Sequence, residues 1–396
     1  MSDGGYAGTT AATAGPLPVL FLVADTGGGH RSAAQAVSQA LGRLYPGRFV
    51  PVLCDPLGGP GSAALLRWIS GCYGPAIRLA PWLWGAAYHA SDSRPAMRLL
   101  RRALLRLADR PAADAAAACH PTAIVSFHPL AGMAAVWARD RAAPTVPVAT
   151  VVTDLATTHV AWHHAEADLI ISPPGPPVTR GFWAGPLRRG ERVCLRRSLG
   201  LSDTRFLVLL TGGADGTGGI GRRAAAILSR LADVDVVAVC GRNRRLKRRL
   251  DRLAARSGGR LTVTGFTRSM DSWLRCCDVV VTRAGPGIIA EATCCGTPLL
   301  VTSHLPGQEK GNTEFVTSAG AGRHVPGVRR LVAEIGQLRD DRAAVDAMRA
   351  AAARLGRPAA AAEIAEQIAC LAWDGVAQAR SPRRAGILEG DRHGRN

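Results

Sequence analysis

The sequence is poor in several features that would each have pointed to a class of protein. Only 5% of its 396 residues are aromatic, and the 30 acidic residues are outnumbered by 49 lysines and arginines. The aromatic residues do not alternate with basic ones as in a platform for single-stranded nucleic acid, and no groove-reading motif occurs. We therefore expect no nucleic-acid partner. The formal net charge of +19 still predicts an anionic partner, and an anionic membrane surface is the preferred interpretation.

Cysteine in a metal-binding spacing is also absent. The ten cysteines include two adjacent pairs, Cys276-Cys277 and Cys294-Cys295, but no C-x-x-C, so a zinc site is not predicted. A chain of this length does not depend on disulfides for its core. We expect reduced, mostly buried cysteines, and neither a metal nor a cofactor.

The sequence has no long uninterrupted apolar run. Its N-terminus lacks the basic start and hydrophobic core of a signal peptide. Residues 115–138 carry no formal charge and are long enough to cross a bilayer, but Pro121 and Pro129 interrupt a pattern of strand followed by helix. We predict no transmembrane helix and a cytoplasmic protein that is peripheral at the inner face of the cell membrane.

Length and alternation predict two α/β domains with parallel sheets. Hydrophobic residues make up 47% of the chain, as in globular proteins. We place the domains at residues 17–185 and 186–375. A disordered N-terminus (1–16) and a basic disordered tail (376–396) are predicted to flank them.

The stretch from 279 to 312 carries the most informative pattern. Val279–Val281 reads as a buried strand, Gly285-Pro286-Gly287 as a sharp turn and Ile288–Cys295 as a helix. Small residues at such a turn let backbone N–H groups approach a phosphate, and the helix N-terminus adds a favourable dipole. The pattern predicts a phosphate site, although ordinary α/β turns share it.

Polar side chains follow this turn. Glu291 lies about one helical turn in, where a carboxylate can bind a pair of ribose hydroxyls. After the strand Leu299–Thr302, the loop Pro306–Asn312 presents Gln308 and Glu309 between glycines. Such side chains do not help a core, so we interpret the stretch as a nucleotide site with hydroxyl-binding groups beside it. The simpler alternative is a solvated Glu291.

A second glycine turn opens the first half. Strand Pro18–Ala24 runs into Asp25-Thr26-Gly27-Gly28-Gly29-His30, and helix Arg31–Tyr45 follows. His30 thus begins a helix at the carboxyl edge of the predicted sheet, where catalytic groups of open α/β folds gather. The alternative is a histidine that only caps the helix or contacts solvent.

Two further strands of the first half end in polar residues. Ala123–Phe127 is followed by His128, and Val148–Val152 is followed by Asp154 and, a few residues later, by His159. Because parallel strands end at one edge of a sheet, these side chains are predicted to lie near the glycine turn. For Asp154 and His159 the alternative is the capping of a loop.

An aromatic stretch and a basic helix predict contact with lipid. Residues 62–89 place five aromatic side chains among apolar ones: Trp68, Tyr73, Trp82, Trp84 and Tyr88. Residues 94–110 are predicted to form a helix with one apolar face and one basic face, the latter made by Arg98, Arg101, Arg102 and Arg106. A plain surface helix docked on the sheet is the alternative.

The second half repeats strands that end in glycine-containing turns pointing one way: 206–210, 234–239 and 261–264. These turns bring Gly213 and Arg242 to the predicted nucleotide edge, where Arg242 can neutralise phosphate or form a surface ion pair. Gly216–Gly221 spells G-x-G-x-x-G, as in nicotinamide oxidoreductases. It follows the strand only after five intervening residues, so this alternative has little weight.

Three segments together resemble one family. T-G-G-G-H-R-S-A-A-Q-A-V around His30, T-V-V-T-D-L-A-T-T-H-V-A-W around Asp154 and the stretch 278–312 resemble the monogalactosyldiacylglycerol synthases and processive diacylglycerol glucosyltransferases. A more distant likeness is to the N-acetylglucosaminyltransferase that makes lipid II. The resemblance implies the GT-B fold, in which two Rossmann-like domains face a cleft. The first domain lies on the acceptor and membrane side, and the second binds the nucleotide sugar.

The resemblance also implies an inverting transfer of a hexose from a UDP-sugar to a lipid acceptor such as diacylglycerol. His30 is the implied base, supported by Asp154. The implied acceptor and phosphate-loop residues are Gly27, Gly28, Gly29, His128 and His159. In the family the glycine turn binds diphosphate, the acidic helix residue binds ribose and the Gln-Glu loop binds sugar hydroxyls. The implied donor-binding residues are Gly213, Arg242, Phe266, Met270, Gly285, Pro286, Gly287, Ile288, Glu291, Gln308 and Glu309.

One segment departs from the family pattern. After Leu169–Ser172 the chain runs into the proline-rich Pro173–Val178, where family members carry an additional helix and strand. A non-catalytic nucleotide-sugar or lipid-binding homologue is therefore an alternative. The hexose, the oligomeric state and the acceptor stay open; the acceptor is diacylglycerol, another lipid alcohol or a polyketide-like small molecule.

Overall fold

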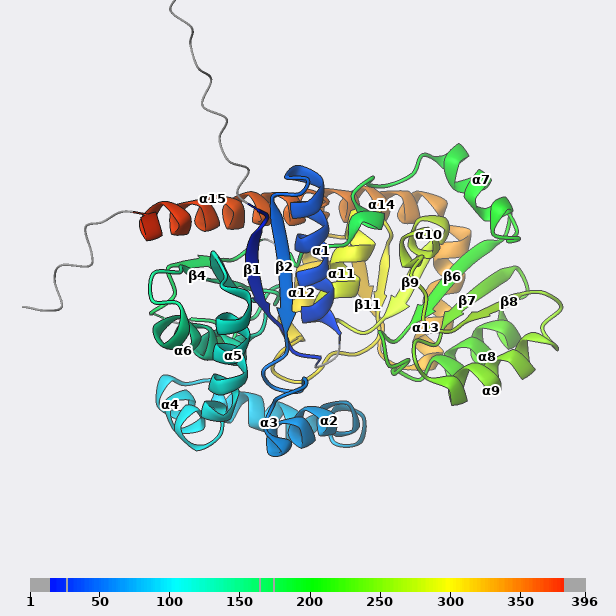
Figure 1. Ribbon diagram of the computed structural model, residues 1–396. Helices are drawn as coiled ribbons and strands as arrows, with labels where there is room; N and C mark the ends of the chain where they lie inside the picture. Colours follow the sequence, from blue (N-terminus) through cyan, green and yellow to red (C-terminus); the bar gives the residue numbers. More distant parts are fainter. Residues whose placement is uncertain (1–14, 26–27, 164, 174, 381–396) are drawn as a thin grey trace, which may run out of the picture.

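The computed structural model describes residues 15–25, 28–163, 165–173 and 175–380 (Figure 1). Most of the stretches predicted to be disordered, 1–16 and 376–396, lie outside these residues, as does Gly27. Residues 376–380, however, form the end of the last helix, α15 (Ala360–Arg380).

Two parallel sheets organise the described chain, one in each half. The first has the strand order β2-β1-β3-β4-β5, with β1 Leu17–Leu22, β2 Phe49–Cys54, β3 Ala123–Ser126, β4 Val148–Val151 and β5 Leu169–Ile171. The second has the order β11-β10-β9-β6-β7-β8, with β6 Phe206–Thr211, β7 Val234–Val239, β8 Leu261–Thr264, β9 Val279–Thr282, β10 Leu299–Val301 and β11 Gly322–His324.

These strand orders fix where a ligand can bind. Read from β8, the second sheet has the Rossmann order 3-2-1-4-5-6, which reverses direction between β6 and β9. The first sheet has the order 2-1-3-4-5, which reverses between β1 and β3. Open α/β sheets bind ligands outside the carboxyl ends of the strands at such reversals. The predicted glycine turns follow β1, β6 and β9, so they lie at these two points.

Helices cover both faces of each sheet. Those of the first half are α1 Gly29–Leu44, α2 Ala64–Leu79, α3 Pro81–Ser91, α4 Arg94–Ala103, α5 Asp109–Cys119 and α6 Gly132–Ala142. Those of the second half, besides α15, are α7 Arg189–Ser198, α8 Ile220–Arg230, α9 Arg244–Ala254, α10 Met270–Cys276, α11 Pro286–Cys294, α12 Lys310–Ser318, α13 Val328–Asp340 and α14 Arg342–Leu355.

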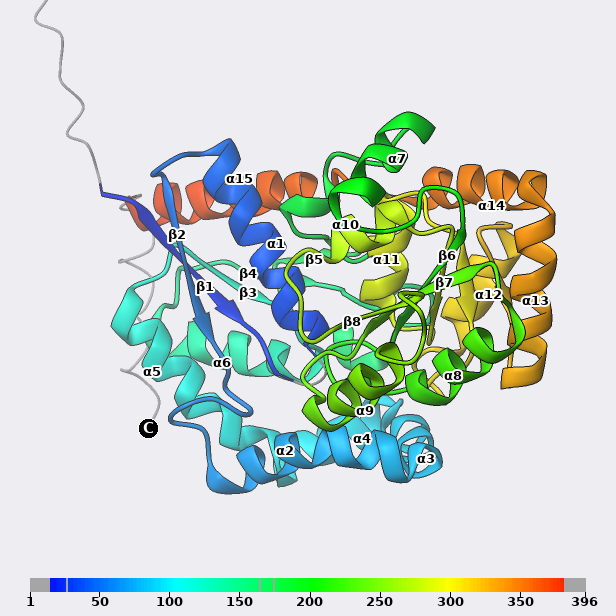
Figure 2. The same ribbon diagram turned by 90° about the vertical axis from the view of Figure 1, so that its right-hand side faces the viewer.

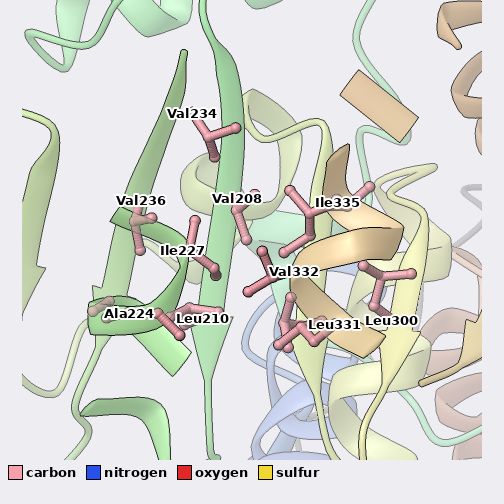
Figure 3. Close-up of a cluster of buried hydrophobic side chains, with 14 of the residues drawn as sticks. Val208, Leu210, Ala224, Ile227, Val234, Val236, Leu300, Leu331, Val332 and Ile335 are labelled. Atoms are coloured by element: carbon pink, nitrogen blue, oxygen red, sulfur yellow. The ribbon is translucent and has the colours of Figure 1, made fainter. Parts of the chain in front are cut away.

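The core of the second sheet explains why its strands are continuous runs of valine and leucine. Both faces of a covered parallel sheet are buried, so its strands need no polar alternation. On one face, Val208 and Leu210 of β6 meet Ile227 of α8 and Val332 and Ile335 of α13 (Figure 3). Each such side chain contributes about 1.5–3 kcal/mol when fully buried.

The last helix packs on the first sheet rather than the second. Ile364 and Ile368 of α15 lie in the same buried cluster as Val19, Phe21 and Val125, and α15 crosses from one half of the molecule to the other (Figure 1). The end of the C-terminal helical segment therefore completes the core of the first half.

The helices α2, α3 and α4 lie together along one edge of the molecule in both views (Figures 1 and 2). The helix predicted over 94–110 is broken. It ends at Ala103, and the 3₁₀ turn η1 (Leu105–Ala108) follows. After the break, Leu105 is buried beside Met97 and Ala161. The single apolar face predicted for one continuous helix is therefore not formed.

Candidate active site

His30 lies where sequence reasoning placed it, in the first turn of α1. Its imidazole is half-buried, and Nδ1 lies 2.8 Å from the hydroxyl oxygen of Thr153, just beyond β4. The residue before the helix, Gly28, has a φ of 81°, which favours glycine. A Cβ at Gly28 would lie 3.7 Å from Cβ of Ala214, so the glycine turns of the two sheets face each other across a narrow cleft.

The environment of His30 favours the neutral form of its imidazole. Burial lowers its pKa below the usual value, while the Asp154 carboxylate and the Phe127 carbonyl act in the opposite direction. The His30 ring meets the ring of His128 edge-on at 4.5 Å and that of Trp162 at 6.1 Å. A neutral imidazole next to a carboxylate can accept a proton and then be stabilised as a cation.

Asp154 supports this site from a short distance away. Its Oδ2 accepts a 2.7 Å hydrogen bond from Nε1 of Trp162, and its Oδ1 accepts one of 3.4 Å from Nε2 of Gln308. Among the described residues the hydroxyl of Thr153, not this carboxylate, contacts the imidazole of His30. Asp154 thus acts on His30 through its charge, and it joins the base side of the cleft to the predicted sugar loop.

The two other predicted histidines lie close by but have distinct partners. His128 is buried and accepts the Leu130 N–H at Nδ1 (3.2 Å). Burial and then the neighbouring His30 hold the pKa of His128 well below its usual value. His159 accepts the Ala161 N–H at Nδ1 (3.0 Å), and its Nε2 lies 3.3 Å from the Tyr88 carbonyl. It therefore caps η3 (Val160–Trp162) and ties it to α3; its place in an acceptor pocket stays a prediction.

The predicted diphosphate turn joins β9 to α11. Gly285 precedes the helix, Pro286 occupies its first turn, and no side chain caps the helix N-terminus. Initial N–H groups of a helix have no partner within it. Because proline has no N–H, Gly287 and Ile288 are the residues that present theirs to a ligand. The predicted phosphate-binding geometry is thus formed by backbone alone.

Glu291 is half-buried on α11, and no hydrogen bond or ion pair to its carboxylate is found among the described residues. Burial, and then the charge of Asp271, raises the pKa of Glu291 to about 7. A half-buried carboxylate without a donor is free to accept hydrogen bonds from a ligand. Two hydroxyl donors on adjacent carbons would satisfy both of its oxygens, as the predicted ribose contact requires.

The sugar loop places its two predicted side chains differently. Glu309 is only 2% exposed; its Oε2 accepts the Leu305 N–H (2.8 Å), and its Oε1 lies 3.6 Å from Nη2 of Arg283. Gln308 points toward Asp154, and its Oε1 is buried without a partner among the described residues. Sequence reasoning gave no role to Arg283 or to Thr153, which is a polar residue at the end of its strand; the signal for Arg283 was a cation two residues before the glycine turn.

The remaining donor-binding predictions lie at the same edge of the second sheet. Gly213 has a φ of 73° in the turn after β6, and Met270 opens α10. The Arg242 guanidinium lies 5.2 Å above the Phe266 ring, which is 58% exposed. Within the described chain Arg242 has no acidic partner, so its guanidinium stacks on Phe266 and does not form the alternative surface ion pair.

The structure also places an Asp-x-Asp tripeptide and the segment that follows β5. An Asp-x-Asp tripeptide, Asp233–Asp235, escaped the sequence reasoning; it enters the amino end of β7, away from the cleft edge, and Asp235 pairs with Arg205 (3.3 Å). Downstream of the proline-rich segment, Arg275 donates to the carbonyls of Gly181 (2.7 Å) and Gly185 (2.9 Å).

Comparison with known proteins agrees with this geometry. The family model "Monogalactosyldiacylglycerol (MGDG) synthase" matches residues 30–174, and "Glycosyltransferase family 28 C-terminal domain" matches residues 207–368. The probable monogalactosyldiacylglycerol synthase 2 of rice (Oryza sativa subsp. indica) is 31% identical over 336 residues, which cover 78% of this chain and 71% of the rice protein. The chain belongs to the monogalactosyldiacylglycerol synthase family.

Other members are similar at comparable distance. Monogalactosyldiacylglycerol synthase 1 of Arabidopsis thaliana is 29% identical over 334 residues, covering 78% of this chain and 62% of that protein. Membership of the family makes the chain a glycosyltransferase rather than a nicotinamide oxidoreductase. The resemblance of its three motif segments is thereby confirmed.

Solved structures confirm the GT-B fold. MurG of Acinetobacter baumannii superimposes with a TM-score of 0.58 at 17% identity, covering 90% of this chain and 100% of MurG. HepE of Anabaena, in complex with UDP, superimposes with a TM-score of 0.54 at 15% identity, covering 89% of this chain and 100% of HepE. In the part of the chain that the structure describes, none of the helices has the length and apolarity to span a bilayer.

Proposed function

We propose that this family member transfers a hexose from a UDP-hexose to the hydroxyl of a lipid acceptor, diacylglycerol being the leading candidate, with inversion at the sugar carbon. The hydrogen bond between Asp154 and Gln308 carries the proposal, because it joins a residue beside the predicted base to the predicted sugar loop. Solved complexes of HepE with UDP and with UDP-glucose support the donor, and the names of the curated relatives support the acceptor.

The geometry suggests a single displacement. In the tautomer in which Nδ1–H of His30 donates to the Thr153 hydroxyl, Nε2 is the basic nitrogen that takes the acceptor's hydroxyl proton. The acceptor oxygen then bonds to the anomeric carbon as the bond to the diphosphate breaks, and the leaving electron pair goes to UDP. The N–H groups of Gly287 and Ile288 and the dipole of α11 stabilise the developing charge, and Glu291 holds the ribose.

A basic cavity supports the proposed contact with an anionic membrane. It has a volume of about 480 Å³ and is lined by Arg98, Arg101, Arg102, Arg106, Asp109, Met133 and Trp137. Asp109 pairs with Arg101, which leaves the other three arginines without a carboxylate among the described residues. Large apolar side chains of α2–α4 are exposed nearby: Trp68, Leu79, Trp82 and Leu99. We propose a peripheral position at the cytoplasmic face of the cell membrane.

A donor-by-acceptor screen tests this function. Radiolabelled UDP-galactose, UDP-glucose and UDP-N-acetylglucosamine are each incubated with the protein and diacylglycerol vesicles, and glycolipid product is measured. One donor should give product, and His30→Ala should abolish turnover while UDP still binds. Binding of UDP without product from any donor would favour the non-catalytic homologue; unchanged turnover in His30→Ala would exclude the base.

A further inference from the structure

The α2–α3 hairpin has two faces of different character. Trp68 and Trp82 point outward, 67% and 70% exposed, as predicted for a lipid boundary. Tyr88 is only 8% exposed, and Tyr73 and Trp84 are half-buried with their rings edge-to-face at 4.9 Å. Three of the five aromatic residues assigned to the lipid surface therefore turn into the protein.

The inward face lies directly on the sugar loop. A Cβ at Gly307 would lie 2.7 Å from the Tyr88 ring, and one at Gly85 would lie 2.6 Å from Cβ of Pro306. Both glycines are required because the hairpin and the loop touch at these points. Burial raises the pKa of Tyr73 to about 12, and the charges acting on its hydroxyl include Arg283 and Glu309. The hairpin thus packs directly on the loop predicted to hold the sugar, and we call this contact face the wall.

This wall contains polar atoms that are buried and unpaired. Nε1 of Trp84, the hydroxyl of Tyr88 and Oε1 of Gln308 have no hydrogen-bond partner among the described residues. A buried polar group without a partner costs about 1–3 kcal/mol. Trp84 can only donate, the amide oxygen of Gln308 can only accept, and the Tyr88 hydroxyl can do either. A phosphate would satisfy Trp84 but not Gln308, whereas a hydroxyl satisfies both.

We propose that Trp84 and Tyr88, together with Gln308, bind the hydroxyls of the transferred hexose and so determine which sugar is used. The proposal rests on the proposed function, since it names a wall of the same donor site. Aromatic side chains with a polar atom suit a sugar, because their faces cover its apolar ring and their polar atoms meet its hydroxyls. Sites that hydrogen-bond a substrate hydroxyl discriminate strongly against analogues that lack it.

The test uses Tyr88→Phe and Trp84→Phe, which remove the polar atoms and keep an aromatic ring. The kcat/KM for the preferred UDP-hexose should fall about 10- to 100-fold in each, because a hydroxyl of the bound sugar loses its partner. Affinity for UDP alone, measured by calorimetry, should stay within twofold. The Tm of Tyr88→Phe should not fall, since the variant loses an unpaired buried hydroxyl.

The matched controls are Tyr45→Phe and Trp373→Phe. In the wild type, Tyr45 and Trp373 pack together against Phe49 of β2, so both variants should behave as wild type.

Donors lacking one hydroxyl at a time locate the contact. For the hydroxyl that Tyr88 binds, the deoxy-donor should react poorly with the wild type, and Tyr88→Phe should cause no additional loss. Equal losses for every deoxy-donor, an unchanged kcat/KM, or a change in acceptor KM alone would overturn the proposal. If UDP does not bind the wild-type protein, the proposed function itself is wrong. If the wild type binds UDP and forms product, but Tyr88→Phe and Trp84→Phe have the same kcat/KM as the wild type, only the assignment of these two residues is wrong.

Discussion

At the scale of single residues, His30 is held by a hydroxyl, and this is testable. Thr153→Val keeps the shape of the side chain but removes the hydroxyl that contacts Nδ1, so the imidazole loses a partner that orients its ring. We expect kcat to fall about 10- to 100-fold, which is within the usual contribution of a positioned base, with little change in the donor KM. Steady-state kinetics with varied UDP-hexose measures both.

The strand that precedes Thr153 supplies the control for that variant. Thr150, on β4, is buried and its hydroxyl has no partner among the described residues, so Thr150→Val should leave kcat unchanged and be neutral or stabilising. Equal losses of kcat in the two variants would mean that Thr153 acts through local packing and not through its contact with the imidazole.

Glu291 predicts how donor affinity depends on pH. Its pKa of about 7 in the free protein means that the carboxylate is mostly protonated at pH 6 and mostly ionised at pH 8. The ionised form accepts two ribose hydroxyls, so calorimetric affinity for UDP-hexose should rise about tenfold over this range. Glu291→Gln should bind weakly at both pH values. A flat profile in the wild type would contradict the ribose assignment.

The free energy of unfolding of the free protein should fall as pH rises, whereas donor affinity should increase. Because the folded pKa of Glu291 lies above its usual 4.5, the folded state binds more protons than the unfolded state between pH 4.5 and 7, and stability falls as pH rises through this window. Above pH 7 Glu291→Gln should therefore be more stable than the wild type, by roughly 3 kcal/mol at most. Chemical denaturation of the free protein at pH 5 and pH 8 measures the difference; a variant no more stable than wild type at pH 8 would show that the ionised carboxylate is not costly there.

At the scale of elements, α4 and η1 should provide membrane affinity. Replacing Arg98, Arg102 and Arg106 by glutamine leaves the Arg101–Asp109 pair intact. About 1 kcal/mol per basic residue near an anionic surface predicts a loss of roughly 100-fold in binding to phosphatidylglycerol vesicles at low salt. Arg245, Arg249 and Arg252 of the equally basic α9 form the matched control triple, and they are expected to matter much less. Equal losses would indicate a response to net charge alone.

The helices and strands were predicted better than the side-chain contacts between them. Runs such as Val279–Val281 specify buried strands, and polar residues after each strand had to gather at one edge because parallel strands end there. Period and spacing do not say what faces a side chain across a cleft between two sheets. The Thr153–His30 contact, the Gln308–Asp154 bond and the inward turn of Tyr88 depend on how the halves meet, so they required the structure.

At the scale of the whole molecule, the two halves depend on each other through α15. This helix follows the second sheet in sequence but completes the core of the first, where Ile368 is fully buried near β1 and β3. Ile368→Ala should cost about 2–5 kcal/mol and should increase hydrogen exchange in β1 and β3 more than in β6 and β9. Ile335→Ala, in the core of the second sheet, should show the reverse pattern. If both variants loosen the same strands, the sheets unfold as one unit and α15 has no special role; if each loosens its own sheet, the chain's last helix is what secures the half that carries His30.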